Sequence, residues 1–240
     1  TRRSSDLSIS VVGSAYGQGA LKLTTVNTMT NTGNGTVNIT GTSNTNVGVN
    51  IGGTNITMTM PNTSILGSSG TGTGVRICAT GNIALSGVRI LGTSGSGTSA
   101  CITAGVGTGN GGTNIAANVT LVSDTGTWVI SGNTTNIAGM DAVKLNNRLN
   151  ATSGSLSIIG VASTGSGVNF TNASGIDLTA TGAGTINVSG TATTGVGVRI
   201  MAGMNLTNSG TNYINVTGSE TGATGAAIDI TGGMNVPGLM

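Results

Sequence analysis

The chain lacks histidine, and it carries few aromatic and few charged side chains. Among 240 residues there is no His, while aromatic residues make up 2% and charged residues 6%. Without histidine, the commonest general base, the Ser-His-Asp arrangement and the usual zinc and copper ligands are missing. The six acidic residues are scattered along the chain, and no Gly-Gly-x-Gly-x-Asp calcium repeat occurs. We therefore expect no enzyme, no metal site and no cofactor.

Long hydrophobic runs and a strong net charge are also absent. No run of about 18 apolar residues occurs, so the sequence predicts no transmembrane segment. The net charge is +2, from 8 basic and 6 acidic residues. This charge is too weak and too dilute for a nucleic-acid surface, and we expect no nucleic-acid partner. No segment carries a 3.6-residue apolar stripe, so the composition of Thr, Val, Ile, Asn and Gly favours an all-β chain.

What the chain has instead is a five-residue phrase, apolar-x-β-branched-x-Gly, that returns along its length. Its copies are Ile9 to Gly13, Val37 to Gly41, Thr63 to Gly67, Val88 to Gly92, Trp128 to Gly132, Leu156 to Gly160, Ile186 to Gly190 and Ile214 to Gly218. The closing glycines lie 28, 26, 25, 40, 28, 30 and 28 residues apart. A period of this size is typical of a solenoid rather than of a globule with one core.

The third residue of each phrase is β-branched and predicts a stacked, inward-facing core column. The column reads Val11, Ile39, Ile65, Ile90, Ile130, Ile158, Val188 and Val216. Side chains alternate in a strand, so the mostly polar second residue faces outward. The closing glycine suits a corner that needs either positive φ or a close backbone approach.

Two further strands accompany each phrase. The second follows the pattern apolar-polar-apolar, as in Val198-Arg199-Ile200, and a shorter third one is centred on residues such as Ile56 and Ile83. We predict a right-handed parallel β-solenoid of about eight three-stranded rungs, each of 25–30 residues, over residues 1–240 as a single domain. The one 40-residue step predicts an insertion loop near 105–116, with Trp128 as core filler on the same rung.

The middle residue of the second strand predicts a single outward file of basic side chains. Lys22, Arg76, Lys144 and Arg199 hold four of the eight basic residues, with neutral residues between them. Such a file is typical of a solvated outer face that discourages edge pairing. The functional alternative is weak attraction to acidic glycans or phosphates.

The two cysteines lie on adjacent predicted rungs. Cys78 and Cys101 are 23 residues apart, and no other metal-binding partner accompanies them. A small register shift places them side by side as a disulfide, whereas the register drawn from the phrases leaves them diagonal. Both outcomes remain open at this point.

The chain resembles the filamentous-haemagglutinin-like large exoproteins, a β-strand-repeat adhesin family. The phrases that carry the resemblance are Gly197 to Ile200, Met204 to Thr207 and Ile214 to Gly218, and it extends over essentially all 240 residues. The resemblance implies a β-helical shaft exported to the cell surface, where it serves adhesion, biofilm cohesion or display of a terminal effector.

We therefore expect an extracellular structural protein, the shaft of an adhesin or a surface filament assembled by end-to-end β-stacking. Both ends of the sequence fall within a rung, so another copy or contiguous solenoid of the same chain is the expected partner, with host or matrix glycans as a further class. One alternative is an ice-binding β-solenoid, for which the pairs Thr28/Thr30 and Thr57/Thr59 occur but are not followed by a sustained file of Thr-x-Thr pairs. A second alternative is a carbohydrate-active β-helix, which needs clustered acids.

Overall fold

The computed structural model describes most of the chain. The described residues are 8–94, 98–104, 110–115, 120–122, 127–135, 138–145, 149–151, 155–171, 176–181, 183–201, 203–209, 213–231 and 234–235. They form 24 strands. None of them forms a helix long and apolar enough to cross a membrane.

The strands are short and follow one another along the whole chain. In chain order they are β1 (Ile9–Ala15), β2 (Leu21–Leu23), β3 (Thr28–Thr30), β4 (Val37–Ser43), β5 (Val49–Gly53), β6 (Ile56–Ser69), β7 (Val75–Ala79), β8 (Ile83–Ser94), β9 (Thr98–Thr103), β10 (Asn110–Gly111), β11 (Thr113–Ile115), β12 (Thr120–Val122), β13 (Thr127–Thr134), β14 (Val143–Leu145), β15 (Leu149–Ala151), β16 (Ser155–Ala162), β17 (Ser166–Phe170), β18 (Ile176–Thr181), β19 (Thr185–Ala192), β20 (Val196–Ile200), β21 (Met204–Ser209), β22 (Ile214–Glu220), β23 (Ala226–Ile230) and β24 (Met234–Asn235).

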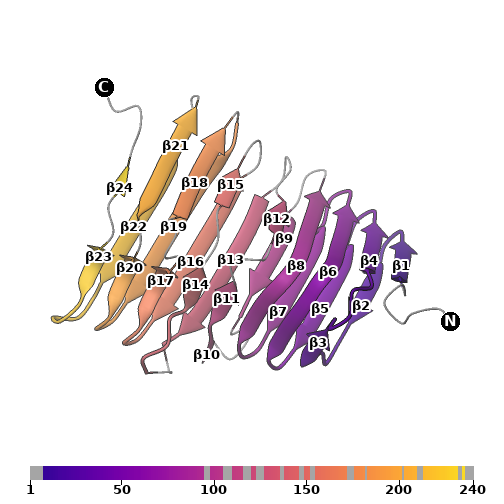
Figure 1. Ribbon diagram of the computed structural model, residues 1–240, viewed down its shortest axis with the longest axis horizontal. Helices are drawn as coiled ribbons and strands as arrows, with labels where there is room; N and C mark the ends of the chain where they lie inside the picture. The colour runs from indigo at the N-terminus through magenta and orange to yellow at the C-terminus, as the bar shows by residue number, and fades with distance from the viewer. Residues whose placement is uncertain are drawn as a thin grey trace.

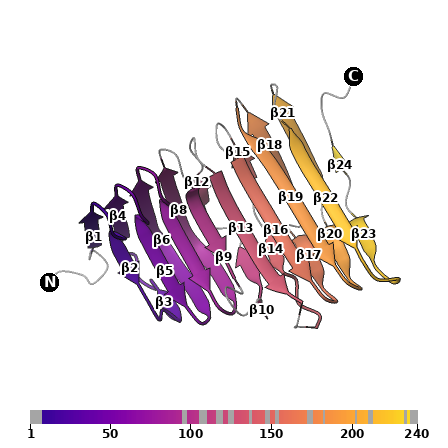
Figure 2. The ribbon, with the colours of Figure 1, turned by 180° about the vertical axis from the view of Figure 1, so that it is seen from behind.

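These strands stack into two long sheets and one short sheet, which confirms the predicted all-β parallel solenoid. The first sheet runs β1-β4-β6-β8-β11-β14-β17-β20-β23, and the second runs β2-β5-β7-β9-β13-β16-β19-β22. A third sheet, β15-β18-β21-β24, closes the C-terminal half. Among the described strands only β10 pairs antiparallel, with β13. Figures 1 and 2 show the coil from both sides, with β1 at one end and the β22–β23 rung at the other.

The number of turns differs slightly from the predicted eight three-stranded rungs, and two of the rungs contain long, bent strands. In β6 and in β8 the predicted third strand runs directly into the phrase. The pairing of β6 with β8 shifts register between Thr59 and Thr63. At this bend Asn62 has φ of 57° and Gly87 has φ of 73°, values in the left-handed region. The corner is thus made inside a strand instead of by a separate turn.

The phrase glycines serve a close backbone approach rather than a positive φ. A Cβ built at Gly41, Gly67 or Gly190 would overlap the carbonyl oxygen of the residue seven positions later, which is itself glycine. The same overlap arises at Gly13, Gly92, Gly160 and Gly218, against Ala20, Ser99, Gly167 and Ala227. The glycine therefore lets the phrase strand fold directly onto the start of the next strand, which is one of the two possibilities raised by the sequence.

The structure corrects the predicted single core column, because its eight residues stand in two sheets. Val11, Ile39, Ile65 and Ile90 stack in register in the first sheet. Ile130, Ile158, Val188 and Val216 stack in the second sheet, where Ile130 lies over Ile102 of β9. All eight belong to inward columns, although Val11 is 40% exposed and Val216 is half-buried at the two ends.

The core column passes from the first sheet to the second at the 40-residue step between Gly92 and Gly132, and we call this change of sheet the column slip. Strands β9, β11 and β12 form one rung: β9 pairs with β7, β11 pairs with the first half of β8, and β12 pairs with the second half of β8. Leu121 of β12 therefore lies over Ile90, at the position predicted for Ile130. The phrase strand β13 then begins the next rung on the neighbouring side, over β9. From β13 onward the phrase strands therefore stand in the second sheet, and the apolar-polar-apolar strands from β14 onward stand in the first sheet.

The predicted insertion loop near 105–116 is therefore partly regular structure. Residues 105–109 and 116 lie outside the described residues, whereas Thr113–Ile115 forms β11 between β8 and β14. Thr113 and Ile115 are buried. The step contains an additional side of the coil rather than only a projecting loop, which is why the columns slip.

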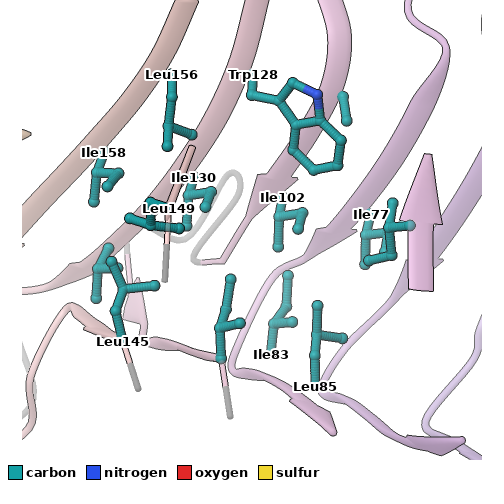
Figure 3. Packing of buried hydrophobic residues seen from close by; sticks show 14 of the residues in the cluster. Ile77, Ile83, Leu85, Ile102, Trp128, Ile130, Leu145, Leu149, Leu156 and Ile158 are labelled. Atoms are coloured by element: carbon teal, nitrogen blue, oxygen red, sulfur yellow. The ribbon is translucent and has the colours of Figure 1, made fainter. Parts of the chain in front are cut away.

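Trp128 fills the core where the columns slip. It is buried, as expected for core filler, and its register places it between Ala100 of β9 and Leu156 of β16. Figure 3 shows the indole projecting into the same interior as Ile102 and Ile130. The small side chain of Ala100 leaves space for the indole, and such a volume match is what dense core packing requires.

We predict that Gly190→Ala lowers the stability of the coil by about 1–3 kcal/mol, because the new methyl group meets the backbone of Gly197, which cannot rotate away. Thermal and urea unfolding, followed by circular dichroism, measure the effect. Gly17→Ala is the matched control, since a Cβ at Gly17 has no neighbour within 4 Å. Equal unfolding midpoints for the two variants would contradict the close-approach argument.

Candidate functional site

The two cysteines are free thiols in the structure, so the disulfide that the sequence left open is not formed. The strand register pairs Cys78 with Thr103 and Cys101 with Arg76, which places the cysteines diagonally across β7 and β9. Both are half-buried on the outer face, and the sulfur of Cys101 lies 3.1 Å from Oγ1 of Thr103. This is the diagonal arrangement that follows from the phrase register.

The predicted basic file is also divided by the column slip. Lys22 and Arg76 stand in the second sheet with Asn50 between them, and Cys101 continues that file. Lys144 and Arg199 stand in the first sheet, on either side of Asn169. The four cations therefore form two pairs on different sides of the coil, and no continuous basic stripe joins them.

The four described carboxylates have partners within the fold. Asp141 accepts hydrogen bonds from the backbone N–H of Ser166 at 2.8 Å and from Nδ2 of Asn169 at 2.7 Å. Asp177 accepts one from Nδ2 of Asn205 at 2.7 Å, and Asp229 pairs with Nε of Arg199 at 3.3 Å. The backbone N–H of Gly225 donates to Glu220 at 3.3 Å. Asp6 and Asp124 lie outside the described residues.

These carboxylates stabilise turns and neighbouring rungs. Within the described part of the chain, no three His, Cys, Asp or Glu side chains gather closely enough to hold a metal ion. The pairings at Asp141 and Asp177 were missed by the sequence reasoning. The signal for the second pairing was present, because Asp177 and Asn205 occupy equivalent positions in the Ile176–Thr181 and Met204–Ser209 strands.

An open cleft of about 510 Å³ lies beside the start of strands β8, β11 and β14. Residues Ala138 to Asp141 border it, and Asn114 and Lys144 contribute polar groups from one outward file. Oδ1 of Asn82 accepts a hydrogen bond from the backbone N–H of Gly112 at 2.9 Å, which ties two neighbouring rungs together beside the cleft. The carboxylate of Asp141 is already engaged as described above, so the cleft offers one ammonium group and several amides.

The predicted threonine pairs lie in register but do not extend into files. Thr28 stacks on Thr57 and Thr30 on Thr59, through the pairing of β3 with β6. On the next rung the same positions are Ala84 and Ser86 of β8. The Thr-x-Thr pattern therefore covers two rungs on this side of the coil.

The most distinctive surfaces are the outer edges of the first and last rungs, where inward columns come to the surface. Val11 of β1 is 40% exposed, whereas Ile39 beneath it is 3% exposed. Ile230 of β23 is 41% exposed, whereas Ile200 beneath it is fully buried. Ile9 and Ile228 are exposed in the same way. We call these two surfaces the β1 edge (β1 and β2) and the β22 edge (β22 and β23).

Each edge combines exposed apolar side chains with the outer side of a parallel strand. Exposed strand edges present unpaired N–H and C=O groups and are templates for pairing with further β-structure. The exposed apolar side chains would gain free energy by burial, at about 25 cal/mol for each Å² removed from water. Chemically, the arrangement is suited to stacking rather than to catalysis.

Comparison with known proteins adds no relative. No family model, no curated protein and no solved structure matches this chain. The resemblance to the large exoproteins therefore stands on the repeat phrases alone.

We predict that two thiols per chain react with Ellman's reagent in unreduced, denatured protein, because the register separates Cys78 from Cys101. The variant Thr103→Cys, which places a cysteine directly opposite Cys78, is expected to lower the thiol count after mild oxidation. Protein that shows no reactive thiols before reduction would contradict the register.

Proposed function

We propose that this solenoid is a structural element of an extracellular fibre or adhesin shaft, and that it acts by stacking its end rungs on further β-solenoid. The observation that carries the proposal is the exposure of the inward columns at the β1 and β22 edges. The apolar side chains exposed there continue columns that are buried inside the coil, as at Ile39 beneath Val11 and Ile200 beneath Ile230.

The internal construction of the coil supports a structural role. Interior rungs pair in parallel with a rung on each side, and the buried cluster runs from Ile39 to Met204 along the coil. In such a quasi-one-dimensional structure each rung depends mainly on its neighbours, so a longer stack adds stability to its end rungs. A shaft needs this property, since its length can grow without any new kind of contact.

The sides of the coil support the same proposal. The outward positions are mainly Ser, Thr and Asn, and the described carboxylates are engaged within the fold. The four cations of the predicted file form two separate pairs. This is the surface of a spacer more than of a substrate site. We propose an extracellular, cell-surface location because the repeat phrases resemble those of the exoproteins. Host or matrix glycans are the partners we propose for the outer basic residues.

We predict that Ile230→Lys abolishes end-to-end assembly while the monomer still folds. In the monomer Ile230 is 41% exposed, so a lysine there can extend its ammonium group into water, whereas in a stack the charge would be buried without a partner. Sedimentation velocity and negative-stain electron microscopy measure the assembly.

Ile159→Lys is the matched control. Ile159 is 42% exposed but points outward from β16, on the side of the coil. The Ile159→Lys variant should therefore assemble like the unchanged chain. Fibres of normal length from the Ile230→Lys variant, or an equal loss in both variants, would count against end stacking.

A further inference from the structure

The β1 edge and the β22 edge carry the same sequence of strand types. The β1 edge offers a phrase strand, Ile9 to Gly13, followed by the second-type strand β2. The β22 edge offers a phrase strand, Ile214 to Gly218, followed by the second-type strand β23. The two edges lie at opposite ends of the coil (Figure 2), so they can meet only between two molecules.

We propose that a second copy of this chain stacks head to tail, with its β1 on β22 and its β2 on β23. This inference rests on the proposed function and names the partner and the register. The phrase strands would meet as Ile214 with Ile9, Val216 with Val11 and Gly218 with Gly13. Each pair repeats a pairing within the chain, such as Ile186 with Ile214 and Gly190 with Gly218.

The glycine pair is the strictest of these matches. Every described contact between phrase strands of one sheet places glycine over glycine, as in Gly13 over Gly41 and Gly160 over Gly190. At Gly13, Gly41, Gly160 and Gly190 the strand folds back so closely that a Cβ would overlap a backbone carbonyl. A stack that keeps glycine over glycine keeps the cross-section of the coil unchanged across the junction.

The second-type strands bring opposite charges together at the junction. Within the chain, the outward file of the first sheet reads Lys144, Asn169, Arg199 and Asp229. In the proposed stack the next residue of that file is Lys22 of the second copy. Asp229 already pairs with Nε of Arg199 at 3.3 Å on its inner side, and Lys22 would flank it on the open side. Successive charges would then alternate in sign across the junction.

The competing register continues each sheet straight through the junction without rotation. It would place Asn215, instead of Asp229, beside Lys22. It would also set Ile228 over Asn27, because Ile228 belongs to the column of Ile83 and Ile56, and Asn27 precedes Thr28, which pairs with Thr57. The chain itself already sets Asn27 over Ile56 in this column, so this contact is not peculiar to the unrotated register, and the neighbour of Lys22 is what separates the two registers.

The proposed register has a geometric consequence. Within each molecule the phrase strands pass from the first sheet to the second sheet between β12 and β13. Stacking phrase on phrase therefore turns each new copy by one side, about a third of a turn in a three-sided coil. Head-to-tail contacts of this kind do not close, so they generate an open helical filament.

Site-specific cross-linking distinguishes the two registers. In a chain that carries Cys78→Ser and Cys101→Ser, Thr217→Cys with Val12→Cys reports the proposed register, and Thr217→Cys with Thr24→Cys reports the unrotated one. All three positions are outward and exposed. Adjacent strands lie about 4.8 Å apart, which a short dithiol cross-linker spans. We expect covalent dimers and higher oligomers with the first pair only.

Each outcome of this experiment has a separate meaning. Oligomers from the Thr24→Cys pair, or filaments without cross-links from either pair, overturn the proposed register while the stacking function stands. A cysteine-free parent chain that forms no filaments overturns the proposed function, and the inference falls with it.

A charge cycle tests the junction independently. Asp229→Asn and Lys22→Gln are each expected to raise the critical concentration for assembly about two- to five-fold, as for an exposed ion pair, and the double variant to be no worse than either single one. Lys144→Gln, a cation away from both edges, should leave the critical concentration unchanged. Additive effects of the two changes would overturn the proposed contact.

Discussion

The close backbone contact at the phrase glycines is the constraint on which the rest of the coil depends. Because Gly190 carries no side chain, β19 can fold directly onto the start of β20 at Gly197. This contact sets the width of the cross-section, and the same width must recur at every level for the strands to remain in register. Ile and Val then fill most of the narrow interior, together with Leu and Met side chains, Phe170 and Trp128. The recurrence of glycine at this point is therefore a packing requirement rather than a feature of a flexible turn.

The slip at the 40-residue step shows how much change this architecture tolerates. One additional side of the coil moves every later column to a neighbouring sheet. The interior remains continuous because β9 and β11 keep the inward-outward-inward alternation of the strands they pair with, at Ala100 and Ile102 and at Thr113 and Ile115. The local adjustment is the match between Ala100 and Trp128. Ile and Val side chains pack equally well in the columns of either sheet. The chain can therefore move from one column to the next with a small loss of packing free energy.

The same interchangeability connects the interior to the proposed function. An inward column that accepts any Ile- or Val-bearing strand of the right width also accepts one from another molecule. The β1 and β22 edges thus differ from the interior rungs only in having one neighbour instead of two. The specificity of such a junction depends on the features that differ from the apolar repeat, which are the glycine contact and the few charged side chains. Among these charged side chains, Lys22 and Asp229 lie at the edges.

The sequence alone determined the local structure of this protein. The alternation of apolar and polar residues around Ile39, Ile65 and Ile130 placed strands and inward faces correctly, because the period of two is a property of each strand by itself. It also indicated Trp128 as core. Only the tertiary structure decided which strand lies over which. Ile130 stacks on Ile102 rather than continuing the column of Ile90, Lys144 and Lys22 belong to different sheets, and Cys78 faces Thr103. These pairings depend on how many sides of the coil the chain makes between Gly92 and Trp128. That number is set by non-local packing, for which the repeat phrase carries no signal.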